Sequence, residues 1–235
     1  MEHIGYLPEE RGLYKKMKVG EQILYLAQLK GLSKNDAKEG MKYWLNKFDI
    51  KGWEKKKIEE LSKGMQQKIQ FITTVMHNPK LLIFDEPFSG FDPVNANLLK
   101  QEILEMRDKG ATIIFSTHNM GSVEEICSHI ALINKSRKII EGPINQIREK
   151  YASNTYQLSC RYNPEFSPEQ TIGSEFEIVS QRVEGDRQDI ILQQNTYCPA
   201  NTLLSRVLPQ TDIISYQKII PSMNDIFIKL VKEQA

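Results

Sequence analysis

The first half of the chain alternates between two hydrophobic patterns, a helical spacing and short continuous apolar runs. The helical spacing covers residues 19–29 and resumes after Ser33, which forms a capping box with Asp36. Strands that alternate with helices of this length predict a parallel α/β sheet. The apolar runs, each bounded by turn residues or Pro, predict strands over residues 3–7, 81–84 and 111–115.

The pattern changes at about residue 152. Polar turns now separate short strand candidates, and Gly185-Asp186 is a hairpin signal. We therefore predict two domains, an α/β domain over residues 1–151 and a small α+β domain over residues 152–235. The first ends with strands near residues 130–133 and 138–141 and a helix over 143–151; the second has strands at 156–161, 175–182, 189–193 and 213–219 and helices at 200–208 and 223–231.

Two acids follow the apolar run 81–84 directly. Asp85 and Glu86 stand where a parallel strand opens onto a loop, and ligands of open α/β sheets bind beyond that carboxyl end. One acid there can hold Mg²⁺, and a second can orient or deprotonate a water. Taken alone, a strand that ends in Asp-Glu is more often an ordinary strand with a solvated tip.

A second candidate site lies about twenty residues earlier. Ser62 and Gly64 precede an amphipathic pattern, which places them at the N-terminus of a predicted helix. Free N–H groups and the positive end of the helix dipole favour an anion at such a position.

Taken together, these segments resemble the nucleotide-binding domain of ABC transporters. The resemblance implies a truncated P-loop NTPase fold, in which a parallel sheet carries a helical subdomain that ends near residue 62. The second domain is similar to the C-terminal extension of ABC ATPases of the sodium-, drug- and polymer-export type. The matching segments are Leu61 to Met65 (signature motif), Leu81 to Glu86 (Walker B), Ser89 to Asp92 (D-loop), His118 (switch histidine) and Glu9, where the Q-loop usually has glutamine.

The resemblance also implies a role for each residue in binding and hydrolysing ATP with Mg²⁺. Asp85 and Glu9 are implied to bind the metal, Glu86 to polarise the attacking water, and His118 to hydrogen-bond the γ-phosphate or that water. In this family two domains pair head to tail. The residues implied to act across that interface are Ser62, Lys63 and Gly64, on the γ-phosphate of the opposite site, and Ser89 and Asp92, between the two domains.

One expected motif is absent from the printed sequence. No glycine is followed by lysine, so there is no G-x-x-x-x-G-K-[ST] segment to cradle the phosphates. The resemblance therefore implies the later part of such a domain, poorly active by itself. We also expect the missing P-loop strand to leave the edge of residues 81–84 and a stripe of apolar surface exposed.

Composition and charge exclude several classes of partner. Lys and Arg number 31 and Asp and Glu number 30, a net charge of +1 that does not favour nucleic acid. Cys127, Cys160 and Cys198 are widely spaced, which indicates reduced thiols. No apolar run approaches the roughly 18 residues of a membrane span. We therefore expect a peripheral protein that docks on a membrane subunit at the cytoplasmic face.

Two functions are consistent with these features. The first is an ATP-binding and ATP-hydrolysing subunit of an ABC transporter that exports its substrate. It would power transmembrane permease subunits and pair with a second ABC ATPase domain in a homodimer or heterodimer. The alternative is a degenerate, non-enzymatic partner that lends Ser62 and Gly64 in trans to a complete subunit.

Overall fold

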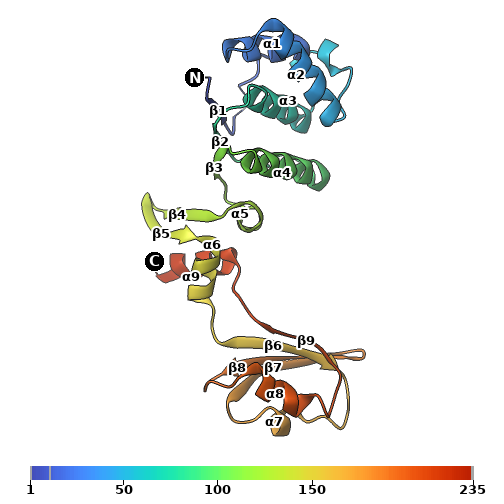
Figure 1. Cartoon of the computed structure of the whole chain (residues 1–235), viewed down its shortest axis with the longest axis vertical. Coiled ribbons are helices and arrows are strands. Elements are labelled where there is room, and N and C mark those ends of the chain that lie inside the picture. The colour runs from blue at the N-terminus through green and yellow to red at the C-terminus, as the bar shows by residue number, and fades with distance from the viewer. Residues whose placement is uncertain (1, 11, 234–235) are drawn as a thin grey trace. The chain divides into compact units, whose positions relative to one another are not determined.

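The computed structural model describes residues 2–10 and 12–233. The chain divides into two compact units, residues 1–122 and 123–235 (Figure 1). Within the described part of the chain, no helix combines the length and hydrophobicity needed to cross a membrane.

The first unit contains a three-stranded parallel sheet. Its strands β1 (Ile4–Leu7), β2 (Leu81–Asp85) and β3 (Thr112–Ser116) lie in that order. The predicted strands are therefore present, but the expectation that residues 81–84 form an exposed edge is wrong. Strand β2 is central and pairs with β1 on one side and β3 on the other.

The two faces of this sheet differ in their environment. Leu7, Leu82 and Phe84 on one face are at most 1% exposed, and the Phe84 ring lies 5.9 Å from that of Phe71 between centroids. Strand alternation turns the remaining side chains to the other face. There Ile4, Tyr6 and Ile114 are 43%, 54% and 55% exposed, whereas Leu81 and Ile83 of the central strand are partly buried.

Helices supply the rest of the first unit. Ser33 caps its helix as the sequence predicts, and the structure shows two further caps, because Ser62 and Asp92 also accept a backbone N–H of the following turn. The helices are α1 (Val19–Leu29), α2 (Lys34–Lys47), the 3₁₀ turns η1 (Trp53–Lys55) and η2 (Ile58–Glu60), α3 (Lys63–Val75), α4 (Pro93–Asp108) and α5 (Met120–Ile126), the last of which runs across the division between the units.

The second unit begins with an antiparallel hairpin of β4 (His129–Asn134) and β5 (Arg137–Pro143), followed by α6 (Ile144–Tyr151). The last helix, α9 (Met223–Glu233), packs on α6. Arg148 Nε donates to the Pro221 carbonyl at 3.0 Å, and Arg148 pairs with Glu124 at 3.2 Å. The end of the chain is thus joined to residues 123–151, and the domain boundary expected after residue 151 stays a prediction.

A four-stranded antiparallel sheet forms the remainder, in the order β7-β8-β6-β9. One face packs Leu158, Ile190 and Leu192 against helix α8, and all three side chains are fully buried. The turn at Gly185, whose φ is +63°, joins β7 to β8 as the sequence predicts. The elements are β6 (Thr155–Arg161), α7 (Pro168–Thr171), β7 (Phe176–Glu184), β8 (Arg187–Gln194), α8 (Ala200–Val207) and β9 (Ile213–Lys218).

Candidate functional site

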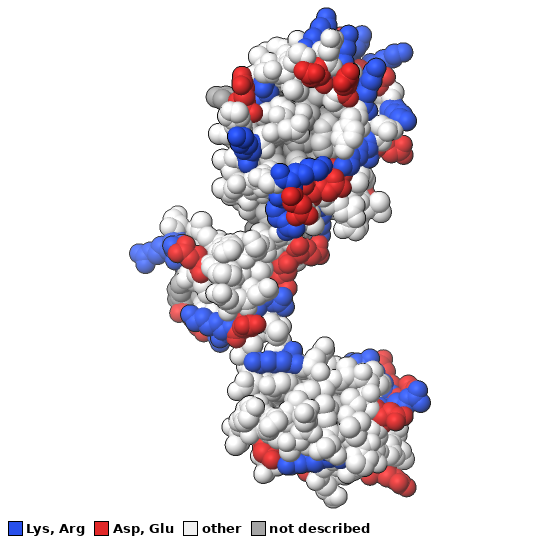
Figure 2. All heavy atoms as spheres, in the orientation of Figure 1, with Lys and Arg blue, Asp and Glu red and all other residues white. Residues whose placement is uncertain are grey.

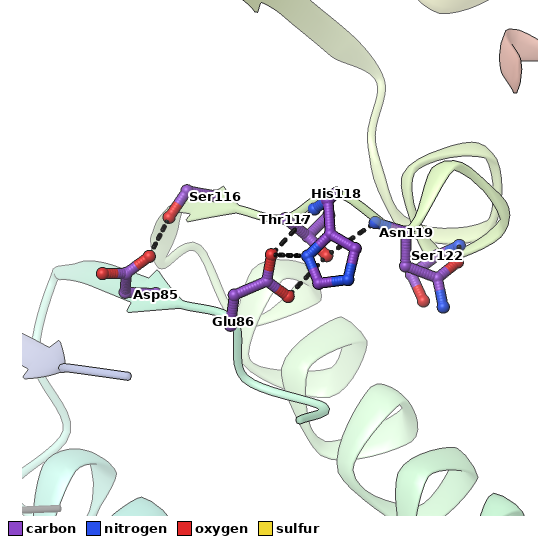
Figure 3. Close-up of polar contacts among 7 residues, drawn as sticks. All are labelled: Asp85, Glu86, Ser116, Thr117, His118, Asn119 and Ser122. Atoms are coloured by element: carbon purple, nitrogen blue, oxygen red, sulfur yellow. Dashed lines mark hydrogen bonds and ion pairs between the residues drawn. The ribbon is translucent and has the colours of Figure 1, made fainter. Parts of the chain in front are cut away.

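The two acids that the sequence singles out lie at the carboxyl end of β2, next to the end of β3 (Figure 3). Asp85 is the last residue of β2 and pairs in register with Ser116. Glu86 comes one residue later, and its backbone N–H donates to the Ser116 carbonyl at 3.0 Å. Parallel pairing thus brings the residues after β3 against the acids, although 31 residues separate them in sequence.

Asp85 is held by one hydroxyl. Ser116 Oγ donates to Asp85 Oδ1 at 2.5 Å, and the rest of the carboxylate is partly open to solvent. The Asp85 carboxylate therefore offers a hard oxygen donor at the sheet edge.

Glu86 is held more tightly, and its side chain is only 16% exposed. Thr117 Oγ1 donates to Glu86 Oε2 at 2.9 Å, while the backbone N–H of His118 donates to Oε1 at 2.8 Å. The Nδ1 atom of the His118 ring also lies 2.6 Å from Oε1. The carboxylate thus has a hydroxyl on one oxygen and two nitrogen partners on the other.

The Glu86 backbone has a left-handed conformation with φ of +46°. This conformation is uncommon for a residue with a side chain, costs roughly 1–3 kcal/mol, and persists only where its surroundings impose it. Here the N–H bond to Ser116 and the carboxylate bonds to Thr117 and His118 impose it.

His118 differs from its neighbours in exposure. Its ring is 90% exposed, so the Glu86 contact is its anchor at this edge. A carboxylate that touches an imidazole at a sheet edge can exchange a proton with a water or orient that water. The side chains of Glu86 and His118, proposed from the sequence as a catalytic pair, are therefore brought together.

The second predicted site is at the N-terminus of α3. Ser62 caps this helix by accepting the Met65 N–H at 3.3 Å, and Lys63 is its exposed first residue. Gly64 lies against the loop that follows Glu86, since a Cβ added there would be 3.3 Å from the Gly90 carbonyl oxygen. The N-terminus of α3 therefore packs directly against that loop.

The loop residues Ser89 and Asp92 have structural contacts of their own. The Ser89 N–H donates to the Glu86 carbonyl at 3.1 Å, and the Ser89 side chain is exposed. Asp92 caps α4, and the side-chain amide of Asn95, with backbone N–H groups of the same turn, lowers the pKa of its carboxyl. In this chain Asp92 therefore acts as a helix cap.

Glu9 lies on an exposed bend two residues beyond the end of β1, at the same edge of the sheet as Asp85. Within residues 2–10 and 12–233, no group of three or more His, Cys, Asp or Glu side chains forms a metal cluster. Mg²⁺ commonly uses only one or two carboxylates and takes its other ligands from waters and phosphates. The Asp85 carboxylate, beside the Ser116 hydroxyl, is a donor set of that kind.

Sequence reasoning missed the two hydroxyl residues that hold the acids. Neither Ser116 nor Thr117 is among the site residues predicted from the sequence. A signal was nevertheless present, since two hydroxyl residues follow a buried strand just as two acids follow the neighbouring one. The signal can be interpreted only once the strand register is known, because that register places Ser116 opposite Asp85.

Comparison with known proteins gives two family matches. Residues 1–89 match the family described as ABC transporter, and residues 142–231 match the C-terminal domain of DrrA1-3-like ATP-binding proteins. The first range includes the two acids and the predicted signature segment. The second range includes the four-stranded antiparallel sheet of the second unit.

Individual relatives agree with these matches. An ABC transporter ATP-binding protein of Alkalihalophilus pseudofirmus is 52% identical over 148 residues, which are 63% of this chain and 55% of that protein. YhaQ of Bacillus subtilis, also described as an ABC transporter ATP-binding protein, is 51% identical over 63% of this chain and 50% of its own length. The linearmycin resistance ATP-binding protein LnrL of Bacillus subtilis is 30% identical over 65% of this chain and 49% of its length.

A solved structure of an ATP-binding subunit of an ABC transporter superposes with a TM-score of 0.60 at 29% identity. The match covers 64% of this chain and 62% of that one. The matched region of this chain spans about half the length of the relatives named above.

Proposed function

We propose a function for this chain, which is related to the ATP-binding subunits of ABC transporters and has their α/β fold. It hydrolyses ATP on the cytoplasmic face of a membrane and powers transmembrane permease subunits. The C-terminal match to DrrA1-3-like proteins and the similarity to a linearmycin resistance protein support export as the direction of transport.

In this proposal the residues at the β2 and β3 ends carry out the chemistry. Asp85 and Glu9 would hold Mg²⁺, which would supply positive charge to the phosphates. Glu86 orients the attacking water and accepts its proton, because its carboxylate is already fixed at the sheet edge. His118, whose ring is mostly exposed, contacts the γ-phosphate or the water.

The N-terminus of α3 serves the site of a second ATPase domain. Ser62 and the Gly64 N–H bind the γ-phosphate held by that domain, since a helix N-terminus favours an anion. Lys63 adds positive charge beside them. The loop with Ser89 and Asp92 connects the two sites, and its packing against Gly64 supports this role. The second domain is another copy of this chain or a related subunit.

A phosphate-binding loop is also required. The printed sequence holds no G-x-x-x-x-G-K-[ST] motif, so we propose that such a loop reaches Asp85 from a polypeptide segment outside these 235 residues. Residues 1–235 alone are then poorly active, because positioning of the phosphates accounts for most phosphoryl-transfer catalysis.

The observation that carries this proposal is the convergence of Thr117 and His118 on the Glu86 carboxylate. Its test is ATP turnover by the purified transporter that contains this chain. Glu86→Gln should lower turnover by about 10²–10⁴-fold, the range expected for a general base. Glu149→Gln, the same change at an exposed position of α6, is the matched control and should leave turnover unchanged. Equal turnover in both variants would rule out the proposed role of Glu86.

A non-enzymatic role is the second candidate. The missing Gly-Lys pair favours it, since a chain without a phosphate cradle can still lend Ser62 and Gly64 to a complete partner. Photocrosslinking with a radiolabelled azido-ATP distinguishes the two candidates in the assembled transporter. The enzymatic role requires that the probe label this chain near Asp85 and Glu86, and that an excess of unlabelled ATP prevent this labelling. The degenerate role requires that the label fall on the partner and decrease in a Ser62→Ala variant.

A further inference from the structure

We infer that Thr117 is a positioning residue, which fixes the Glu86 carboxylate and keeps it in place when the His118 ring moves. This inference rests on the proposed function of Glu86. It assigns a role to a residue that neither the motifs nor the comparisons single out.

The strand geometry assigns one hydroxyl to each acid. The side chains of successive residues in an extended chain point to opposite sides. The hydroxyls of Ser116 and Thr117 therefore cannot both donate to the same acid. Ser116, paired in register with Asp85, donates to Asp85, while Thr117 donates to Glu86 (Figure 3). Replacing one hydroxyl should therefore affect one acid and leave the other held.

The direction of the Thr117 hydroxyl is itself fixed. A threonine hydroxyl has one proton to donate and lone pairs that accept. The Asn119 N–H donates to Thr117 Oγ1 at 3.1 Å, and Asn119 Oδ1 in turn accepts the Ser122 N–H at 3.2 Å. These bonds tie Thr117 to the first turn of α5 and leave its proton for Glu86 Oε2 at 2.9 Å.

The partners of Glu86 differ in their freedom to move. The His118 ring is 90% exposed, and the proposed function requires it to reach a phosphate or a water. Thr117 is half-buried and its hydroxyl is tied by Asn119. When the ring swings away, Thr117 and the His118 N–H still hold the Glu86 carboxylate, and the Ser116 carbonyl still holds the Glu86 N–H.

The first test needs no nucleotide. The His118 amide proton donates to Glu86 Oε1, so its exchange with solvent reports whether the carboxylate stays in place. In the full chain, Thr117→Val should raise the exchange rate of this amide about tenfold, the scale of one hydrogen bond to a charged group. Thr117→Ser should restore slow exchange, and Ser116→Ala should leave it slow. Fast exchange in Ser116→Ala but not in Thr117→Val would overturn the inference.

The second test separates positioning from folding and from the proposed function. In the assembled transporter, Thr117→Val should lower the kcat for ATP about tenfold with KM within twofold, and Thr117→Ser should keep at least half of the wild-type kcat. If Glu86→Gln abolishes turnover while Thr117→Val does not change kcat, this inference fails and the proposed function stands. If Glu86→Gln has no effect, the proposed function itself fails.

Discussion

The three-stranded parallel sheet and the four-stranded antiparallel sheet differ in which of their faces are buried. Both have one face packed in a core, but the other face of β1-β2-β3 carries apolar residues, with Ile114 55% exposed. The corresponding face of β7-β8-β6-β9 is polar, and Gln157, Ser159 and Asp189 form hydrogen bonds across it. Charged side chains are scattered over the surface of both units (Figure 2).

This difference follows from how the strands pair. Antiparallel sheets commonly face water on one side, whereas parallel sheets occur with both faces covered. The C-terminal sheet, with one buried apolar face and one polar face, therefore has the usual composition of an antiparallel sheet. The parallel sheet has the composition of a sheet that is covered on both faces, and its acids stand at the edge where such sheets bind ligands.

The largest expected effect tests whether each sheet has its own core. Phe84→Ala should destabilise the first unit by about 3–5 kcal/mol, because Phe84 is fully buried against Phe71. Hydrogen exchange measured amide by amide should then show lost protection in β1 to β3 and unchanged protection in β6 to β9. Equal loss in both sheets would mean that they unfold together.

A smaller effect concerns a partly buried ion pair of the first unit. Lys47 lies 2.6 Å from Glu102, whose side chain is 4% exposed, and these contacts outweigh burial and raise the pKa of Lys47. Lys47→Ala should cost about 3 kcal/mol, since it leaves Glu102 buried without its cation. The control Lys109→Ala removes a lysine whose side chain is 73% exposed and should cost less than about 1 kcal/mol. Urea unfolding of the full chain measures both.

The open face of the parallel sheet allows a more selective change. Ile114→Thr keeps a β-branched residue in β3 and removes exposed apolar surface. We expect stability within about 1 kcal/mol of wild type and weaker binding of a hydrophobic dye. Ile190→Thr, on the buried face of the C-terminal sheet, should instead destabilise its sheet. Dye binding that is unaffected by Ile114→Thr would show that this face is not the exposed apolar surface.

The smallest effect is a pH dependence in the second unit. Two hydrogen bonds from Arg206 lower the pKa of Glu175 to about 2 from a usual 4.5. Because the pKa is lowered on folding, the pair stabilises the fold above pH 4.5, and this contribution disappears as the pH falls toward about 2. Wild type should therefore exceed Glu175→Gln in stability at pH 7, with a difference that vanishes near pH 2.

Denaturant unfolding at several pH values, followed through amide signals of β6 to β9, measures that difference. Glu184→Gln is the control, because the Glu184 side chain is 75% exposed in its pair with Arg182. A difference between wild type and Glu175→Gln that stayed constant from pH 7 to pH 2 would contradict the account of this pair.

Much of the fold was predictable from local patterns. The capped helix after Ser33, the strand before Asp85 and the hairpin at Gly185 are set by short-range chemistry, and each is present at its predicted place. The position of β2 between two other strands was not predictable, because strand order depends on contacts between distant segments. The same holds for α9, whose apolar stripe indicates burial but not its partner α6.

The candidate site divides in the same way. The acids Asp85 and Glu86 were predictable, since they interrupt an apolar run at its end. The hydroxyls that hold them were not, because Thr117 reaches Glu86 only through the pairing of β2 with β3. The left-handed backbone of Glu86 is likewise a tertiary effect that the residue type alone disfavours.

The central claim is that Glu86 makes the chain's own site hydrolytic. The most direct measurement is the chemical identity of the nucleotide that remains bound after the assembled transporter is incubated with radiolabelled ATP. The account predicts mostly ADP on the wild-type assembly and mostly uncleaved ATP on the Glu86→Gln assembly. ADP formed on the Glu86→Gln assembly at the wild-type rate would contradict it.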